Sequence, residues 1–488
     1  MARFLSPTAE QQRIIDAVPS GGKLKIKAYA GAGKTSTLRL VADRLSQRRG
    51  MYLAFNREIA EQARRSFPAN VSSGTIHSLA YRSVSPDLAA RVGYPAEPPH
   101  ELAARFGLAA LEVPLATGKP VELTPFELGR MVVDGLGRFC RSADAVPAPV
   151  HVPIDEKIDP RAADWLRSAL HPYVARLWDE SRHVRGRSAI IPDVYLKVWA
   201  QSSPRIDSDF ILFDEAQDSD GVMLWLLNQQ THAQTIFVGD PYQQIYEWRG
   251  AVNAMAQISA PEYALTESFR FGPAIARLAS RLLALLGENV PVRGQDSIGS
   301  IGVDDPSLSP PVDAILCRKN VSAIWHLAVG VESGYRPSIR MSPAEIVAYA
   351  DGADALLGSR RAYKPAAFSL FETWKDVQSF ARSAVGADLL PIVRIVDEFG
   401  TDYLRALSQR VASESNSDYV IATVHRAKGL EWKRVKVVND FLFKYVDGRL
   451  AVEEDELRLL YVAITRAQHL LDISDLRDDL MRLLAPGR

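Results

Sequence analysis

The segment Ala28 to Thr35 constrains this chain more than any other, and it reads Ala-Tyr-Ala-Gly-Ala-Gly-Lys-Thr. It follows a run in which Lys alternates with Leu24, Ile26 and Ala28, the period of a strand, and it opens a helical pattern over Gly33 to Arg48. A glycine-rich turn between a strand and a helix directs backbone N–H groups and a helix N-terminus at one point. The chain is therefore expected to form a parallel α/β sheet that binds phosphate groups at the carboxyl ends of its strands.

The residue types in this turn have defined uses on a nucleotide. Gly31 and Gly33 let the backbone turn inward around phosphates, Lys34 would reach the β- and γ-phosphates, and Thr35 would ligate Mg²⁺ through its hydroxyl. Ala28 stands where the strict pattern has glycine. The alternative is a glycine turn beside an exposed lysine. The segment predicts nucleotide contacts from Gly31, Ala32, Gly33, Lys34, Thr35 and Ser36.

An acidic pair follows a second candidate strand. Phe210 to Phe213 is a short, fully apolar run, and Asp214 and Glu215 come directly after it. Asp214 is placed to hold Mg²⁺, usually through water, and Glu215 to polarise the water that attacks the γ-phosphorus as a general base. The alternative is that the pair forms only a turn and the start of a helix, but the phosphate loop upstream favours the catalytic interpretation.

The run Val238 to Gly250 combines two kinds of ligand chemistry. Gln243 stands where a polar side chain would sense a phosphate at the end of a strand. Tyr246, Trp248 and Arg249 are residue types that stack on bases and hold a nucleic-acid backbone. The alternative is a loop whose tyrosine and tryptophan pack on a neighbour. The phosphate loop and the acidic pair favour an element that couples a nucleotide to a nucleic acid.

Composition limits the partners and the compartment. The chain has 488 residues, too many for one ordinary core, and its 58 basic residues balance 58 acidic ones, so any nucleic acid must be bound by local patches. Two isolated cysteines, Cys140 and Cys317, suit a reducing cytosol. No signal peptide is evident, and no run approaches the ~18 apolar residues of a membrane span. We expect a cytoplasmic protein, in a bacterial-type cytosol or nucleoid, without a membrane partner.

Strand and helix patterns recur near the C-terminus, at Tyr419 to Thr423, Val435 to Val438 and Glu453 to Arg466. The fold class is therefore expected to be α/β, with two lobes built on parallel sheets that each carry a mainly helical insertion. The predicted ranges are 1–82 and 205–264 for the first lobe, 83–204 for its proline-rich insertion, 265–320 and 417–488 for the second lobe, and 321–416 for a short second insertion.

A series of short motifs occurs in order along most of the chain. They are EQQRII (Glu10 to Ile15), AYAGAGKT (Ala28 to Thr35), AFN (Ala54 to Asn56), TIHSLAYR (Thr75 to Arg82), FDEAQD (Phe213 to Asp218), VGDPYQQIYEWRGA (Val238 to Ala251), ESFR (Glu267 to Arg270), TVHRAKGLEW (Thr423 to Trp432) and RLLYVAITRA (Arg458 to Ala467). With this set the chain resembles the superfamily 1 DNA helicases of the UvrD, PcrA and Rep type. Within them it is most similar to the F-box DNA helicases, without an F-box. The resemblance implies two RecA-like P-loop lobes.

The resemblance also implies how ATP is held. Gln11 would read the adenine edge, Phe269 would stack on the adenine face and Glu431 would hold the ribose. Many members of the family carry an arginine just after the phosphate loop, which covers the second face of the adenine, whereas this chain has Ser36. Base selectivity is then looser, or another residue supplies that contact.

Further implied residues act on the γ-phosphate. Gln243 would contact it, and Arg270 and Arg466 would be arginine fingers from the second lobe. Positive charge spread onto a transferring phosphate is worth up to about 10³–10⁵ in rate. Arginines on the far lobe would let ATP close a cleft that hydrolysis reopens. The alternative for both arginines is a plain surface position.

The resemblance places a single-strand channel along both lobes. Stacked aromatic side chains tolerate any base, as a motor requires, and each stack is worth roughly 1–3 kcal/mol. The alternative is a core position for Phe55 and structural roles for His77 and His425. The implied DNA contacts are Phe55, Asn56, Thr75, His77, Tyr246, Trp248, Arg249, Thr423 and His425.

The implied function is an ATP- and Mg²⁺-dependent helicase or translocase on single-stranded DNA and single/double-strand junctions. It would move 3′ to 5′, in DNA repair, recombination or related processing. The alternative is an ATP-gated DNA-binding remodeller or regulatory ATPase with little unwinding, which the short second insertion favours. No carboxylate-rich nuclease segment follows Arg466, so a helicase–nuclease is not expected.

The stacking interpretation of Trp248 predicts a specific defect. Trp248→Ala should uncouple ATP use from movement along DNA more than it weakens ATP binding, because the lost contact is to a base and not to the nucleotide. Parallel measurements of ATP affinity, DNA-stimulated hydrolysis and translocation rate test this. A variant with normal stimulated hydrolysis and normal translocation would show that Trp248 does not stack on DNA.

Overall fold

The computed structural model describes residues 6–184, 186, 188–245, 254–304, 311–360, 362, 364–368, 371–382, 386–446 and 449–485. The chain forms two compact units, each considered by itself below. The first comprises Met1–Ala28 and Gly33–Leu265, and the second comprises Tyr29–Ala32 and Thr266–Arg488. The tip of the glycine-rich turn thus packs with the second unit, although the strand before it and the helix after it belong to the first.

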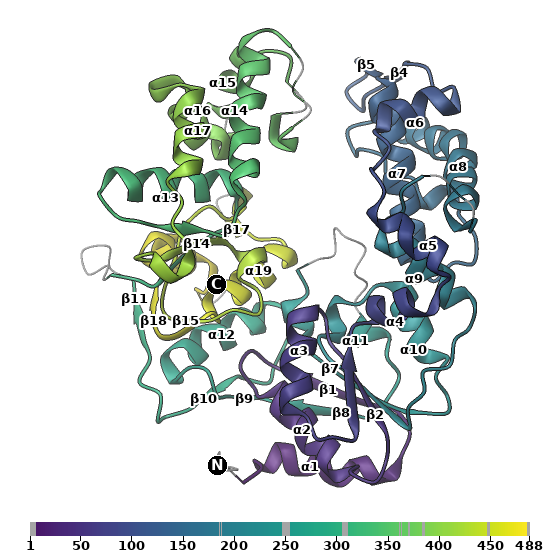
Figure 1. Cartoon of the computed structure of the whole chain (residues 1–488). Helices are drawn as coiled ribbons and strands as arrows, with labels where there is room; N and C mark the ends of the chain where they lie inside the picture. Colours follow the sequence, from purple (N-terminus) through teal and green to yellow (C-terminus); the bar gives the residue numbers. More distant parts are fainter. Residues whose placement is uncertain are drawn as a thin grey trace. The chain divides into compact units, whose positions relative to one another are not determined.

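The first unit is built on a six-stranded sheet in the order β3-β2-β6-β7-β1-β8 (Figure 1). Every neighbouring pair of strands is parallel. Parallel strands are covered on both faces by their crossover helices, so the central strands are mainly apolar, and β6 and β7 are fully buried. The strands are β1 (Leu24–Ala28), β2 (Gly50–Leu53), β3 (Val71–Gly74), β6 (Phe210–Phe213), β7 (Gln234–Gly239) and β8 (Glu262–Leu265).

The lysines of β1 are accommodated by its place beside the edge strand β8. The Lys25 ammonium lies 2.9 Å from Glu262 of that strand and also donates to the carbonyl of Met255. Lys27 lies 3.7 Å from the same carboxylate. The alternating residues Leu24, Ile26 and Ala28 are buried. A strand with two lysines is therefore tolerated inside the sheet because their charges reach a partner on the neighbouring edge strand.

Helices cover this sheet and hold its functional loops. Helix α2 ends at Arg44, one turn earlier than the sequence pattern suggests, because Leu45 leaves the helical region at φ −100° and ψ 28°. The N-cap of α3 is Asn56, whose side chain accepts from Ile59 N. The helices of this layer are α1 (Ala9–Ala17), α2 (Lys34–Arg44), α3 (Arg57–Ser66), α4 (Ile76–Ser83), α10 (Gly221–Asn228) and α11 (Ala254–Gln257).

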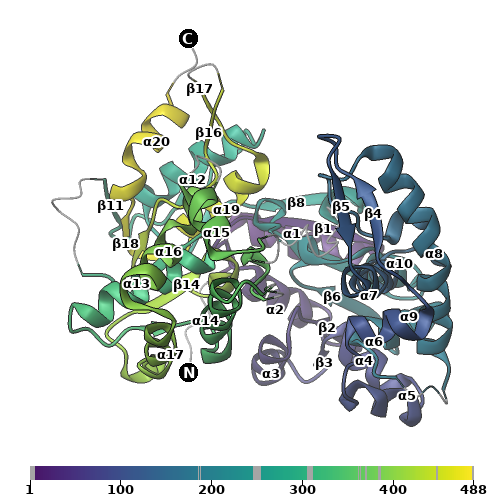
Figure 2. The same ribbon diagram turned by 90° about the horizontal axis from the view of Figure 1, so that it is seen from above.

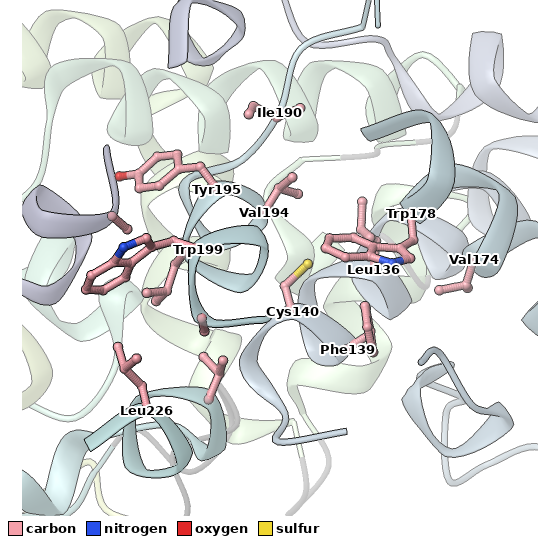
Figure 3. Packing of buried hydrophobic residues seen from close by; sticks show 14 of the residues in the cluster. Leu136, Phe139, Cys140, Val174, Trp178, Ile190, Val194, Tyr195, Trp199 and Leu226 are labelled. Atoms are coloured by element: carbon pink, nitrogen blue, oxygen red, sulfur yellow. The ribbon is translucent and has the colours of Figure 1, made fainter. Parts of the chain in front are cut away.

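The proline-rich stretch of the first unit is a helical subdomain with one hairpin, β4 (Leu111–Pro114) and β5 (Pro120–Leu123). Each of its helices begins at a proline, where the missing N–H costs nothing and the fixed φ favours the first turn. These helices pack around a buried cluster in which the Phe139 and Trp178 rings meet edge to face at 5.0 Å (Figure 3). They are α5 (Pro86–Ala90), α6 (Pro99–Phe106), α7 (Pro125–Arg141), α8 (Pro160–Arg182) and α9 (Pro192–Gln201).

The second unit contains another six-stranded sheet, in the order β11-β18-β15-β12-β14-β13, again with every neighbouring pair parallel. The predicted fold class, α/β with two parallel-sheet lobes, is therefore confirmed. β13 lies within the range 321–416 and still joins this sheet through β14. The strands are β11 (Ile301–Val303), β12 (Ala314–Cys317), β13 (Ser338–Ile339), β14 (Val420–Thr423), β15 (Trp432–Val437) and β18 (Ala467–Asp472).

Helices of the second unit fall into two groups. One group packs against the sheet, and α14 to α17 gather beyond α13 (Figure 1), in an apolar cluster that continues through α13 to Cys317, Ile339 and Ile421 of the sheet. The hairpin β16 (Lys444–Val446) and β17 (Arg449–Ala451) lies beside α20 (Figure 2), where Tyr445 donates to Asp479. The helices are α12 (Pro273–Leu285), α13 (Asn320–Glu332), α14 (Pro343–Leu357), α15 (Trp374–Ala381), α16 (Leu390–Phe399), α17 (Thr401–Gln409), α18 (Val424–Ala427), α19 (Glu454–Ile464) and α20 (Arg477–Leu483). In the described part of the chain, no helix has the length and apolarity needed to cross a bilayer.

Candidate nucleotide and nucleic-acid site

The structure brings together the lysine of the phosphate loop and the glutamate that follows β6. Lys34 is the first residue of α2, and its Nζ lies 2.8 Å from Oε1 and 2.9 Å from Oε2 of Glu215. Both side chains are mostly buried, with 16% and 23% of their surfaces exposed. Strands β1 and β6 are separated in the sheet only by β7, so their carboxyl ends lie close enough for the two loops to meet.

The charges at this point are strongly coupled. Burial alone would lower the pKa of Lys34, but the carboxylates of Glu215, Asp214 and Asp240 outweigh it and raise the pKa above its ordinary value. Burial, followed by the neighbouring Glu215 carboxylate, raises the pKa of Asp214 to about 6. The Lys34 ammonium therefore stays charged and offsets the mutual repulsion of the acidic groups.

Asp214 is held by its neighbours on both oxygens. The Tyr52 hydroxyl of β2 donates to Oδ2 at 2.6 Å, and the backbone N–H of Glu215 donates to Oδ1 at 2.9 Å. These bonds orient the carboxylate and leave it further lone pairs for a metal-bound water. Asp214 and the exposed Thr35 hydroxyl supply hard oxygen ligands of the kind that Mg²⁺ prefers.

The start of α2 is suited to an anion. Its N-cap is Gly33, at φ 75° and ψ 34°, and no side chain caps the helix. The first-turn N–H groups have no intrahelical acceptor, and the helix dipole adds partial positive charge there. Thr35 and Ser36 in this turn are exposed. A phosphate group therefore fits this helix end on the grounds of both hydrogen bonding and charge.

Gly31 occupies a position that only glycine can fill. Its φ is +73°, and a Cβ there would lie 2.4 Å from Ser268 Oγ and 2.6 Å from Arg270 Cβ. Its carbonyl accepts from Phe269 N at 2.8 Å, and the adjacent Ala30 N–H donates to the Tyr461 hydroxyl of α19. The tip of the phosphate loop is thus hydrogen-bonded to α19 and to the segment that carries Phe269, which is predicted to stack on adenine, and Arg270, a predicted arginine finger.

Gln243 and Gln11 are both buried and already engaged in hydrogen bonds. The Gln243 side-chain amide donates to Asp240 Oδ2 at 2.7 Å. The Gln11 amide donates to Thr37 of α2 at 3.1 Å, and its oxygen accepts from Thr8 N in the capping box of α1. Gln11 therefore connects α1 to the helix that follows the phosphate loop, whatever it contacts on a nucleotide.

Arg270 and Glu431, assigned separately to the γ-phosphate and the ribose, are paired with each other. Arg270 Nε donates to one Glu431 oxygen, and its Nη1 donates to the carbonyl of Thr465 at 3.1 Å. Gln468 donates to the other Glu431 oxygen at 2.8 Å. The arginine side chain is largely covered, whereas the Glu431 side chain remains 43% exposed. The pair holds the guanidinium in a defined position next to the residue before Arg466.

Arg466 is almost fully buried, with 1% of its surface exposed, so the plain surface position considered from the sequence is wrong for this residue. Its guanidinium donates to the carbonyls of Val462 and Leu430 and to the Thr465 hydroxyl. These oxygens hold the guanidinium in a defined position. Phe269, by contrast, is 38% exposed, as a face that stacks on a base requires.

Four predicted DNA contacts lie where β2 and β3 end. Phe55 is 47% exposed, which excludes the core position that is its alternative. Asn56 and Thr75 are N-caps of α3 and α4. His77 Nε2 lies 3.4 Å from Asp193 of α9, whose other oxygen accepts from Arg141. His77 therefore also has a structural contact.

The remaining predicted DNA contacts lie in the second unit or outside the described residues. Thr423 is buried at the end of β14, and His425 lies two residues further along in α18. Tyr246, Trp248 and Arg249 lie outside the described residues.

Known helicase domains and helicases are similar in sequence to this chain. Residues 196–263 match the UvrD/REP helicase N-terminal domain, and residues 369–478 match the UvrD-like helicase C-terminal domain. The chain is related to the UvrD-type helicases. It is 29% identical to F-box DNA helicase protein 1 of Schizosaccharomyces pombe, over 96% of this chain and 57% of that protein. It is 30% identical to F-box DNA helicase 1 of Gallus gallus, over 98% of this chain and 50% of that protein. The chain spans about half the length of these curated relatives, and the predicted resemblance is confirmed.

Two residues of this UvrD-related site were not expected from sequence. Tyr52 donates to Asp214 from within β2, and Gln217 donates to Glu215 from the turn after β6. Gln217 could have been singled out because it lies in the same short motif as the acidic pair. Tyr52 carries no local signal, since a tyrosine in a strand is ordinary, and only the pairing of β2 with β6 reveals its contact.

The Lys34–Glu215 pair leads to a direct test. Lys34→Ala should abolish ATP hydrolysis, because the variant loses the phosphate-binding ammonium and leaves Glu215 beside Asp214 without its cation. Steady-state phosphate release measures this, with Lys23→Ala as control, since Lys23 bonds only to Asn228 among the contacts described here. Retained turnover in Lys34→Ala would mean that the phosphate loop is misassigned.

Proposed function

We propose that this chain is an ATP-dependent DNA helicase or translocase that moves on single-stranded DNA. The observation that carries this proposal is the meeting of Lys34 with Glu215 at the end of a parallel sheet. A loop lysine next to a candidate general base, on a helix end suited to an anion, is the arrangement that phosphoryl transfer needs. The relation to UvrD-type helicases supports DNA as the partner of that hydrolysis.

In this proposal the first unit binds and cleaves the nucleotide. Lys34 and the N–H groups of α2 hold the phosphates, Glu215 activates the attacking water, and Gln243 senses the γ-phosphate. Thr35 and Asp214 would hold Mg²⁺, which neutralises charge on the phosphate oxygens when bound. The nucleotide-binding residues of this unit are then Gln11, Gly33, Lys34, Thr35 and Ser36.

The second unit supplies the remaining nucleotide residues in this proposal. Arg270 and Arg466 act as arginine fingers, Phe269 stacks on the adenine and Glu431 holds the ribose. The Arg270–Glu431 pair supports this assignment in part, because it orients the arginine while leaving the carboxylate accessible. Exchange of that ion pair for contacts with ATP would give the arginine a different partner in each nucleotide state.

We also propose that the predicted DNA contacts form a single-strand path. The exposed Phe55 ring stacks on a base, and Asn56, Thr75 and His77 contact the strand from neighbouring chain segments. Thr423 and His425 do so on the second unit, and Tyr246, Trp248 and Arg249 couple the path to Gln243. The proposed substrates include junctions between single-stranded and double-stranded DNA. The proposed setting is DNA repair or recombination, in the compartment that contains the DNA.

A second candidate function is an ATP-gated remodeller of DNA–protein complexes that unwinds little. The observation that favours it is the small size of the helical group α14 to α17, which occupies only the stretch from Pro343 to Gln409. A small accessory subdomain offers little surface against a duplex. The division into lobes at 1–82 and 205–264, and at 265–320 and 417–488, with insertions at 83–204 and 321–416, is part of both proposals.

Single-stranded DNA should strongly stimulate ATP hydrolysis. Binding of the strand to the proposed path would favour the conformation in which Gln243 and Glu215 are correctly oriented on the nucleotide. Phosphate release with and without poly(dT) measures this, and Glu215→Gln, which should not hydrolyse ATP, excludes a contaminating ATPase. An unchanged rate with every nucleic acid tested would contradict the motor.

Strand displacement should require a 3′ single-stranded tail. Duplexes with a 3′ tail, a 5′ tail or blunt ends are incubated with ATP and resolved on native gels, because the tail that is needed reports the direction of movement. Release only from the 5′-tailed duplex would reverse the proposed polarity. Stimulated ATP hydrolysis without release from any duplex would favour the remodeller.

A further inference from the structure

Gln217 lies at the junction of two motifs and is fully buried, with 0% of its surface exposed. Its amide nitrogen donates to Glu215 Oε2 at 2.6 Å and lies 3.2 Å from Asp218 Oδ2. Its amide oxygen accepts from the backbone N–H of Asp240 at 3.0 Å. One side chain therefore bonds the candidate general base with one end and the residue after β7 with the other.

The backbone of β7 is shaped to receive this amide. A Cβ on Gly239 would lie 2.3 Å from Gln217 Oε1, closer than any non-bonded contact allows. The amide is buried and bonded at both ends, so it could yield only by giving up hydrogen bonds. A glycine at this position is therefore required by Gln217, and not by its own backbone, because its φ is not positive.

Glu215 itself depends on outside support. Its backbone is left-handed, at φ 54° and ψ 42°, a conformation that is costly for a residue with a Cβ and persists where the surroundings over-determine it. Lys34 holds its carboxylate from the phosphate loop, and Gln217 holds it from the following turn. When the ammonium instead contacts phosphate, the hydrogen bond from the Gln217 amide can still orient the carboxylate.

Asp240 extends this connection toward the second motif. Its carboxylate accepts from the Tyr242 N–H and from the Gln243 side-chain amide. A shift of the segment that begins at Asp240 would therefore be passed to Glu215 through two hydrogen bonds of one rigid amide. The amide connects the part of the chain that leads to the proposed stacking residues with the carboxylate that activates water.

We propose that Gln217 is a positioning residue that orients Glu215 for hydrolysis and couples its orientation to the segment after β7. This inference rests on the proposed ATPase function. Gln217 has no exposed surface with which to contact nucleotide or DNA, so its loss should change turnover and its dependence on DNA while leaving nucleotide affinity intact.

Gln217→Met tests the orienting role, because methionine keeps the length of the side chain and removes its donor and acceptor. We expect kcat for ATP hydrolysis to fall about 10- to 100-fold, less than the roughly 10²–10⁴-fold that a general base contributes, because Glu215 itself is still present. KM for ATP and Kd for a fluorescent ADP analogue should stay within about two-fold. The fold stimulation by poly(dT) should fall as well, because the segment after β7 no longer reports to Glu215.

Gln230→Met is the matched control. Gln230 is another buried glutamine of the first unit, and it bonds Ile206 N and the carbonyls of Pro204 and Leu226. Its variant should lose a similar amount of thermal stability, measured by circular dichroism, and keep full kcat and full stimulation by DNA. A purely structural role for Gln217 predicts that the two variants behave alike, and that result would overturn the proposal.

Gly239→Ala perturbs the same contact from the opposite side. The new methyl group should displace the amide and reproduce the kcat defect. Its other approaches, 3.1 Å to Gln217 N and 3.2 Å to Ala216 N, need only small shifts. The double variant Gln217→Ala/Gly239→Ala should be no slower than Gln217→Ala, since the displaced amide is already absent. Losses that multiply in the double variant would overturn the link between Gln217 and β7.

The wild-type chain separates failure of this inference from failure of the proposed function. If poly(dT) stimulates hydrolysis in the wild type and stimulates it equally in Gln217→Met, at unchanged kcat, the proposed role of Gln217 is overturned. The proposed motor function is unaffected by that result. Hydrolysis that no DNA stimulates in the wild type contradicts the motor. A selective kcat loss in Gln217→Met under those conditions still supports the orienting role.

Discussion

The parallel order of the first sheet is the constraint on which the rest of the site depends. Neighbouring strands that run in one direction end at the same edge. There β1 leads into the phosphate loop, β6 into Asp214 and Glu215, and β7 into Asp240. β2 and β3 lead at the same edge into Phe55 and Thr75. Residues with nucleotide chemistry and residues suited to nucleic acid therefore share one rigid frame, although they lie far apart in the sequence.

Gathering acidic groups at that edge has an electrostatic cost, and the surrounding residues are arranged to offset it. Burial and mutual repulsion raise the pKa of Asp214, and the Lys34 ammonium and the Tyr52 hydroxyl act in the opposite direction. The same contacts orient the carboxylates, because Tyr52 bonds Asp214 and Gln217 bonds Glu215. The hydrogen bonds that stabilise the buried carboxylates are thus also those that orient them for hydrolysis. This is the basis for the proposed effect of Gln217 on turnover.

The second unit holds its charged groups by another principle. Arg466 is buried, and carbonyl and hydroxyl oxygens define its position. Arg270 instead pairs with Glu431, a carboxylate that remains partly exposed. The former arrangement suits a permanent electrostatic element, and the latter suits an arginine that changes partners. The tip of the phosphate loop at Gly31 packs against this arginine segment, where a Cβ would not fit.

Residue patterns alone predicted much of this protein. The glycine-rich turn, the acidic pair after an apolar run and the ordered motifs were sufficient for the fold class, the family and the candidate nucleotide residues, because each depends on short-range spacing. Tertiary structure decided what spacing does not encode: that the β1 lysines reach Glu262 at the sheet edge, that Arg466 is buried, and that Tyr52 and Gln217 support the acidic pair. The contacts of the β1 lysines and of Tyr52 join residues from different strands, and they follow from strand order, which no local pattern specifies. The burial of Arg466 and the hydrogen bond of Gln217 depend on side-chain packing, which spacing along the chain does not specify either.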